Sequence, residues 1–111
     1  MINIENMKSD IIERLKPLNV DQIVLFGSYA YGTPNEESDI DLYVVTKDDF
    51  IPQNFKENMD IKLKISKAIR DLQKTIPIDI ITHTKAMNKK FVQMGSMFSK
   101  EILENGIKIY G

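Results

Sequence analysis

Apolar residues recur at every third or fourth position in three stretches of the chain, a spacing that places them on one face of a helix. The pattern predicts amphipathic helices over residues 3–16, about 57–75 and about 86–104. Asn105-Gly106 is expected to end the third helix, because Gly commonly follows a helix C-terminus.

Four shorter segments are rich in β-branched or aromatic residues and predict strands. They cover residues 22–26, 38–46, 76–82 and 107–110. Helices and strands alternate along the chain without a linker, repeat or low-complexity segment. The sequence therefore predicts a single domain over residues 1–111 of the α/β or α+β class.

The strand predicted over 38–46 carries two aspartates on one face. Asp39 and Asp41 alternate with apolar residues, so both side chains point to the same side of the strand. Their spacing of roughly 6.6 Å allows them to converge on one Mg²⁺ or to flank a pair of metal ions. Like charges this close repel, and a cation would remove that penalty. The alternative is a solvated strand face.

A glycine turn stands just before this strand. Gly27 and Ser28 follow the apolar run 22–26, and Gly27 permits a tight turn and a close backbone approach. If residues 28–32 begin a helical turn, their backbone N–H groups point at an anion. The alternative is an ordinary connection between two elements of secondary structure.

Two better-known motifs are excluded. Gly27 and Gly32 have the glycine spacing of a P-loop, but Thr33 and Pro34 stand where Lys and Ser or Thr are required. An EF-hand loop starting at Asp39 lacks both the Gly at its sixth position and the Glu at its twelfth.

A third carboxylate lies in the strand predicted over 76–82. Ile78 and Ile80 face one side of that strand and Asp79 faces the other. If this strand lies beside 38–46, Asp79 joins the two earlier aspartates, and three carboxylates form one site. Exposure of Asp79 on a solvated strand face is the alternative.

Together these motifs resemble the polymerase-β-like nucleotidyltransferase superfamily. The matching residues are Gly27-Ser28, ten further residues, Asp39-x-Asp41, and Asp79 on a later strand. The short chain resembles the minimal nucleotidyltransferase (MNT) group in particular. The resemblance implies a palm fold with a small mixed sheet of about four strands packed against helices.

The resemblance also implies a site and a reaction. Asp39, Asp41 and Asp79 would be catalytic and would bind two Mg²⁺ ions, while Gly27, Ser28 and Ser38 would bind the nucleotide. In the family, an acceptor hydroxyl attacks the α-phosphate and pyrophosphate leaves.

Relatives of this size resemble the antitoxins of HEPN/MNT toxin–antitoxin pairs. The implied acceptor is therefore a tyrosine of a HEPN-type toxin, which would receive AMP from ATP. Two alternatives stay open: neutralisation of a partner by occlusion with a vestigial nucleotide site, or a small-molecule transferase of the aminoglycoside type.

The chain departs from the family at two positions. Many relatives carry arginines in a GSRARG-like turn, whereas this chain has Tyr29 and Tyr31. Tyrosine cannot reproduce the bidentate phosphate contacts of arginine. Candidate substitute cations are Lys47, Lys85, Lys89 and Lys90.

Three further features carry weaker expectations. Met87, Met94 and Met97 stand at helical spacing and are expected to pack in the core, with an exposed partner-binding face as the alternative. His83 is expected to be a surface or packing residue. The polar segment 47–56 is a candidate border of the active site.

Composition narrows the partners. The net charge of the 111 residues is −1, and no basic patch or tail predicts direct nucleic-acid binding. The chain has no cysteine, which excludes disulfides and thiolate metal sites and fits a cytoplasmic location. No apolar run approaches the length of a membrane span. The sequence leaves a homo-oligomer open.

Overall fold

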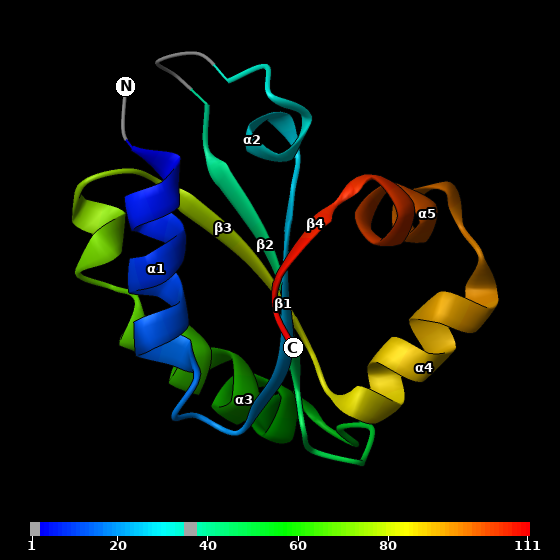
Figure 1. The fold of residues 1–111 in the computed structure, drawn as a ribbon. Coiled ribbons are helices and arrows are strands. Elements are labelled where there is room, and N and C mark those ends of the chain that lie inside the picture. Colours follow the sequence, from blue (N-terminus) through cyan, green and yellow to red (C-terminus); the bar gives the residue numbers. More distant parts are fainter. Residues whose placement is uncertain (1–2, 35–37) are drawn as a thin grey trace.

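Four strands form one mixed sheet in the computed structural model, which describes residues 3–34 and 38–111 (Figure 1). The strands are β1 (Val20–Phe26), β2 (Ile40–Thr46), β3 (Ile78–His83) and β4 (Ile107–Tyr110). They lie in the order β3-β2-β1-β4; β2 and β3 run parallel, and β1 is antiparallel to both β2 and β4. The predicted small mixed sheet is confirmed.

Helices cover both faces of the sheet (Figure 1). They are α1 (Ile4–Leu15), α2 (Ser28–Tyr31), α3 (Phe55–Ala68), the 3-10 turn η1 (Leu72–Lys74), α4 (Lys85–Met94) and α5 (Met97–Asn105). α1 and α3 lie on one side of the sheet, and α4 and α5 lie on the other. Within the described ranges, no helix is long and apolar enough to cross a membrane.

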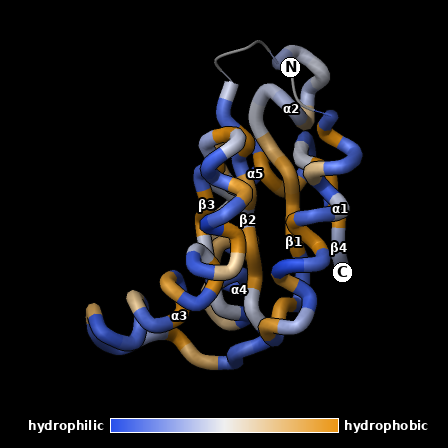
Figure 2. The backbone as a smooth tube through the Cα atoms, turned by 90° about the vertical axis from the view of Figure 1, so that its left-hand side faces the viewer, coloured by the Kyte–Doolittle hydropathy of each residue, from blue (hydrophilic) through white to orange (hydrophobic). Residues whose placement is uncertain are grey.

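Alternation along the strands separates two apolar clusters. In β2, Ile40, Leu42 and Val44 point into the cluster under α1 and α3, whereas Tyr43 and Val45 point into the cluster under α4 and α5. Because both faces of β1 and β2 are covered, these central strands are apolar throughout most of their length (Figure 2). The acidic end of β2 is the exception.

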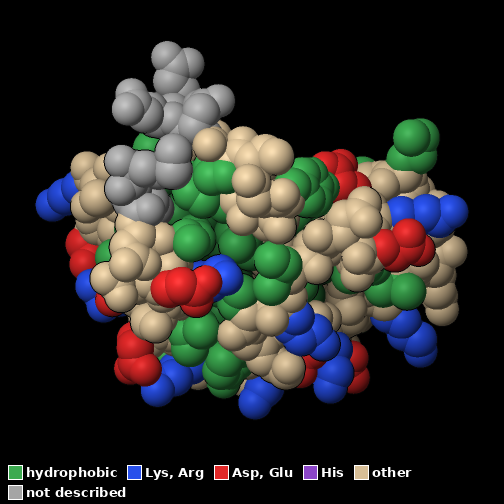
Figure 3. Space-filling model, turned by 45° about the horizontal axis from the view of Figure 1, so that its top comes forward, with side chains coloured by type: hydrophobic (Ala, Val, Ile, Leu, Met, Phe, Trp, Pro, Cys, Tyr) green, Lys and Arg blue, Asp and Glu red, His purple; other side chains and the backbone are tan. Residues whose placement is uncertain are grey.

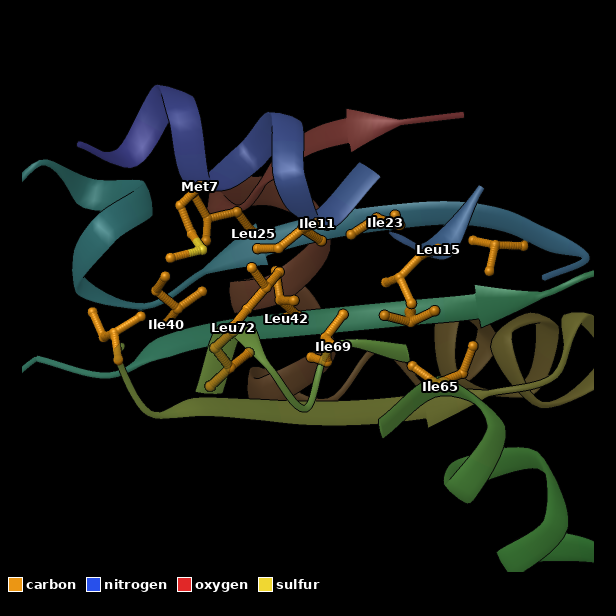
Figure 4. Packing of buried hydrophobic residues seen from close by; sticks show 14 residues of the cluster. Met7, Ile11, Leu15, Ile23, Leu25, Ile40, Leu42, Ile65, Ile69 and Leu72 are labelled. Carbon is orange, nitrogen blue, oxygen red and sulfur yellow. The ribbon is translucent and has the colours of Figure 1, made fainter. Parts of the chain in front are cut away.

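α1 supplies much of the first cluster. Asn3 caps the helix, because its side chain accepts the backbone N–H of Asn6. Met7, Ile11 and Leu15 then project from one face and pack over the central strands (Figure 4). The amphipathic pattern of the first helix is confirmed.

The second helix is shorter than predicted. α3 ends at Ala68 rather than near residue 75, and the chain tightens into η1 before β3 begins. The apolar period still holds, since Ile69, Leu72 and Ile76 are all in the first cluster. Burial of these side chains therefore determines the path of the chain after α3. A 3-10 turn, with its shorter hydrogen-bonding period, replaces the last turns of the predicted helix.

The third predicted helix is two helices. Gly95 adopts φ 58° and ends α4, and the Ser96 side chain accepts the backbone N–H of Ser99 to begin α5. The break changes which residues are buried: Ile102 is buried, whereas Met94 and Met97 are 73% and 89% exposed. The expectation that these two methionines pack in the core was wrong.

Segment 47–56 does not border the acidic end of β2. It follows the opposite end of that strand, where Asp48 accepts the backbone N–H of Lys85 and Phe50 accepts the Thr84 hydroxyl at 2.6 Å. Lys47 stands six positions after Asp41, which corresponds to about 20 Å along an extended chain. The predicted role of this segment at the active site was wrong.

Leu42 provides a test of the first cluster. Replacing the fully buried Leu42 by Ala is expected to lower the free energy of unfolding by about 2–5 kcal/mol, because it leaves a cavity in the central strand. Leu63→Ala on α3 is the matched control, and since Leu63 is 39% exposed it should cost less than about 1 kcal/mol. Urea unfolding followed by circular dichroism measures both. Equal losses would contradict this packing.

Candidate active site

The candidate site lies where β1 ends and β2 begins. These strands are antiparallel, and their register sets Phe26 opposite Asp41. Gly27 directly follows Phe26, so the turn that leaves β1 lies beside the first residues of β2. Gly27 and Asp41 are thus in direct contact, although they are far apart in the sequence.

Gly27 meets two requirements at this point. Its backbone has φ 76° and ψ −160°, a region that essentially only glycine adopts. In addition, a Cβ on Gly27 would overlap the Oδ2 of Asp41 and lie 3.1 Å from its Cγ. The Asp41 carboxylate therefore rests against the backbone of the glycine turn, in space that any side chain at position 27 would fill.

Asp79 lies next to Asp41, as the sequence led us to expect. β2 and β3 pair in parallel with Asp41 opposite Asp79, so both side chains leave the same face of the sheet on neighbouring strands about 4.8 Å apart. Asp79 is exposed and Asp41 is partly buried. Asp39 and Ser38 lie immediately before β2, which begins at Ile40 rather than at residue 38.

The carboxylates repel one another. Burial raises the pKa of Asp41 above its usual range, and the charges of Asp79, Asp39 and Glu101 raise it further. Among residues 3–34 and 38–111, no ion pair neutralises Asp39, Asp41 or Asp79. The site therefore accumulates negative charge that a cation would stabilise.

Mg²⁺ suits this set of side chains, because it prefers oxygen ligands. Within the described residues, no three acidic or histidine side chains already stand in a geometry that holds a metal ion. Mg²⁺ usually binds through one or two carboxylates together with substrate phosphates and water. Asp41 with either of its aspartate neighbours meets that requirement.

The predicted helical turn after Gly27 is present as α2. Ala30 and Tyr31 donate their backbone N–H groups to the Gly27 carbonyl, and Gly32 ends the turn at φ 75°. The first N–H groups of a helix have no partner within it, so those of Ser28 and Tyr29 are available to an oxygen-rich ligand. Ser28 adds a hydroxyl at the same place.

The two tyrosines of α2 have different surroundings. Tyr29 packs against the first apolar cluster, whereas Tyr31 is 44% exposed. The Tyr31 hydroxyl donates to Glu101 of α5 at 2.7 Å. This hydrogen bond, with burial and the charges of Glu101 and Asp41, raises the pKa of Tyr31.

Glu101 is the site residue that sequence reasoning missed. It lies seventy positions from Tyr31 and belongs to a helix whose polar face holds other charged residues, so no local signal distinguishes it. Its charge reaches Asp41 because α5 packs beside β1 and Glu101 accepts the hydrogen bond from Tyr31 of α2. A fourth carboxylate thus borders the site.

The four lysines that are candidate substitutes for arginine lie away from the candidate site. Lys47 follows β2 and Lys85 follows β3, each at the end of the sheet opposite Asp41 and Asp79. Lys89 and Lys90 line a groove together with residues of that same end. Their proposed contact with the triphosphate is not supported by this fold.

His83 is a packing residue, as expected. Its Nδ1 lies 2.9 Å from the hydroxyl of the buried Tyr43, which donates to Asn88 Oδ1 at 2.8 Å. Burial lowers the pKa of His83, and Lys62 lowers it further. The ring of Phe91 packs edge-on against His83, so this group stabilises the α4 side of the sheet.

Sequence comparison identifies two similarities. The family model described as the nucleotidyltransferase domain matches residues 6–109. A protein of Methanocaldococcus jannaschii, assigned as a protein adenylyltransferase, is 33% identical over 99 residues, which is 89% of this chain and 94% of that protein.

Solved structures share the fold. A toxin–antitoxin complex with AMP-PNP contains a chain with a TM-score of 0.62 at 22% identity, covering 94% of this chain and 73% of that one. The complex of a tri-AMPylated Shewanella oneidensis HEPN toxin with its MNT antitoxin matches with a TM-score of 0.57 at 19% identity, covering 96% and 71%. At these identities the likeness concerns the fold.

Gly27 and Gly32 allow a matched test of the turn. Gly27→Ala is expected to displace the Asp41 carboxylate and to abolish stabilisation by Mg²⁺ and ATP, besides the cost of strain of about 1–3 kcal/mol. Gly32 also has positive φ but meets nothing within 4 Å, so Gly32→Ala should cost only about 1–2 kcal/mol. Thermal unfolding with and without Mg²⁺ and ATP measures both. A ligand response that survives in Gly27→Ala would contradict the proposed contact.

The repulsion that acts on Asp41 should also make the free energy of unfolding depend on pH. Because its pKa is raised in the folded state, ionisation opposes folding, so the penalty is absent at low pH and develops as pH rises through the folded-state pKa. In EDTA at pH 7, Asp41→Asn is expected to raise the free energy of unfolding by up to about 1 kcal/mol. The gain should vanish at acidic pH. A pH-independent difference would contradict this cause.

Proposed function

The chain belongs to the nucleotidyltransferase domain family and is a nucleotidyltransferase, and from this premise we propose that it moves AMP from ATP to a tyrosine hydroxyl of a HEPN-type toxin. The transfer would inactivate the toxin, so the chain would act as the antitoxin of the pair. The observation that carries the proposal is the contact between the Asp41 carboxylate and the backbone of Gly27. It brings the acidic cluster against the turn that would hold the triphosphate.

Each site residue has a proposed role. Asp39 and Asp41 hold Mg²⁺, and Asp79 is a third ligand that also orients the acceptor hydroxyl. Backbone N–H groups at Ser28 and Tyr29 bind phosphate oxygens, Gly27 permits their close approach, and Ser38 contributes to nucleotide binding. Bound Mg²⁺ would stabilise charge on both the attacking and the leaving oxygens.

The reaction then follows the chemistry of an in-line displacement. The acceptor oxygen forms a bond with the α-phosphorus, and the bond from that phosphorus to the bridging oxygen of pyrophosphate breaks. The hydroxyl proton passes to a carboxylate of the acidic cluster or to water. Positioning and electrostatic stabilisation are the protein's main contributions.

Two similarities support protein rather than small-molecule modification. The Methanocaldococcus jannaschii relative is assigned as a protein adenylyltransferase. A structure of the same fold contains an AMPylated HEPN toxin with an MNT antitoxin.

Occlusion without catalysis is the second candidate. Tyr29 and Tyr31 replace arginines that would grip the triphosphate, and Glu101 adds a negative charge beside the turn. Thermal shift with ATP and Mg²⁺ separates the candidates, because a ligand at one hundred times its Kd stabilises by about 2.7 kcal/mol. That corresponds to a rise in Tm on the order of 10 °C for a chain of this size. An unchanged Tm with intact toxin binding would favour occlusion.

Transfer itself is tested with labelled nucleotide. The chain, Mg²⁺ and α-labelled ATP should label its cognate HEPN-type protein, whereas γ-labelled ATP should leave the acceptor unlabelled. Asp39→Ala is expected to reduce labelling at least about 100-fold, since removal of a metal ligand costs transition-state stabilisation. Asp60→Ala, an exposed aspartate on α3, should retain full activity. Equal labelling by wild type and Asp39→Ala would refute the proposal.

A further inference from the structure

Exposed apolar side chains gather on α4 and α5. Among the described residues of α4, none is buried, although the helix carries several large apolar side chains. We call the following set the α4–α5 surface: Val92, Met94, Met97, Phe98 and Leu103. Because α4 and α5 contact each other, these side chains lie on neighbouring helices, and large exposed apolar patches mark protein–protein contacts. Methionine is common on such surfaces because it is flexible and polarizable.

The α4–α5 surface adjoins the candidate site. Met97 lies one helical turn before Glu101, so their side chains leave α5 about 6 Å apart. Glu101 in turn binds the Tyr31 hydroxyl and influences the charge of Asp41. Phe98 packs edge-on against Phe26 with ring centroids 6.0 Å apart. Figure 3 turns the end of the molecule that carries α2 towards the viewer and shows hydrophobic side chains reaching its surface.

Charge extends this surface along α4. Lys85, Lys89 and Lys90 lie on α4, which contains no acidic residue, and line a groove of ≈ 990 Å³ with Val92. Asp21 and Asp49 also line the groove, which leaves the lysines in excess. One helix thus offers a basic region at its start and an apolar region at its end, nearer the site.

We propose that the α4–α5 surface and the lysines of α4 form the docking face for the protein acceptor. The acceptor would present an apolar patch flanked by acidic side chains, and its hydroxyl would reach the aspartates beside Glu101. The inference rests on the proposed function, since it names how the acceptor of that reaction is held. The positive charge of this docking face favours an acidic partner protein.

A second copy of this chain fits the face less well. In a symmetric dimer the same patch contributes to both sides of the interface. Two copies of the face would each bring the same lysines to the interface, and α4 has no acidic residue to pair with them. An acidic partner instead gains from the same charges, both in orientation and in the rate of encounter.

Three sets of variants test the docking face. The double variant Met94→Ser/Met97→Ser removes apolar contact, and Lys89→Glu/Lys90→Glu reverses the charge. Phe55→Ser at the start of α3 is the matched control, because Phe55 is 78% exposed and belongs neither to the α4–α5 surface nor to the groove lined by the lysines. Calorimetry measures the Kd for the unmodified cognate HEPN-type protein, and labelled ATP measures KM and kcat for AMP transfer to it.

Both double variants are expected to raise Kd and KM at least roughly tenfold, with kcat retained at saturating acceptor. Phe55→Ser should change none of these values. Charge reversal should also remove most of the salt dependence of binding. The rise in Tm with ATP and Mg²⁺ should equal that of wild type in every variant, which shows that the fold and the nucleotide site are intact.

Unchanged Kd in both double variants, or an equal loss in Phe55→Ser, would overturn the docking face. So would light scattering that shows a wild-type dimer converted to monomer by Met94→Ser/Met97→Ser, because the occupant would then be a second copy. The proposed function fails separately: if wild type binds the HEPN-type protein but transfers no AMP, only catalysis is refuted. The Kd measurements still decide the docking face in that case.

Discussion

The close approach of Asp41 to Gly27 is the contact on which the site depends. It requires the antiparallel register that sets Phe26 opposite Asp41, and it requires a residue without Cβ in a backbone region closed to other residues. Neither condition is sufficient alone. A shift of register by one residue would turn Asp41 to the other face, towards α1 and α3. The fold therefore positions the carboxylate through the backbone pairing of β1 and β2.

The two faces of the sheet carry different tasks. The face under α1 and α3 is closed by a large apolar cluster and accounts for most of the buried side chains. The face under α4 and α5 holds a smaller cluster around Tyr43, and beyond its edge lie Asp41 and Asp79. Strand alternation makes this division possible, because one residue step moves a side chain from one face to the other. The repulsion between the aspartates is thus confined to the face that holds the smaller apolar cluster.

The sequence predicted the parts of the fold whose cause is local. Alternation in 38–46, the apolar run before Gly27 and the spacing of Asp39, Asp41 and Asp79 led to the correct strands and a correct neighbourhood for Asp41 and Asp79. The misses have non-local causes. Met94 is exposed rather than buried in the core, because Gly95 ends the helix and α5 turns back over β1. The position of Glu101 depends on how α5 packs, and the position of the distant lysines depends on the direction of β2. No short window of sequence contains this information.

The two tyrosines of the turn have different structural roles. Tyr29 has joined the core, so it stabilises α2 rather than contacting a ligand. Tyr31 binds Glu101 and thereby connects the turn to α5, the helix that also exposes Met97. An arginine at position 31 would pair with that carboxylate as readily as with a phosphate, since both accept its bidentate hydrogen bonds. Tyrosine instead donates one hydrogen bond to Glu101 without bringing a positive charge, and so the helix beside the site is held without a competing cation in the turn.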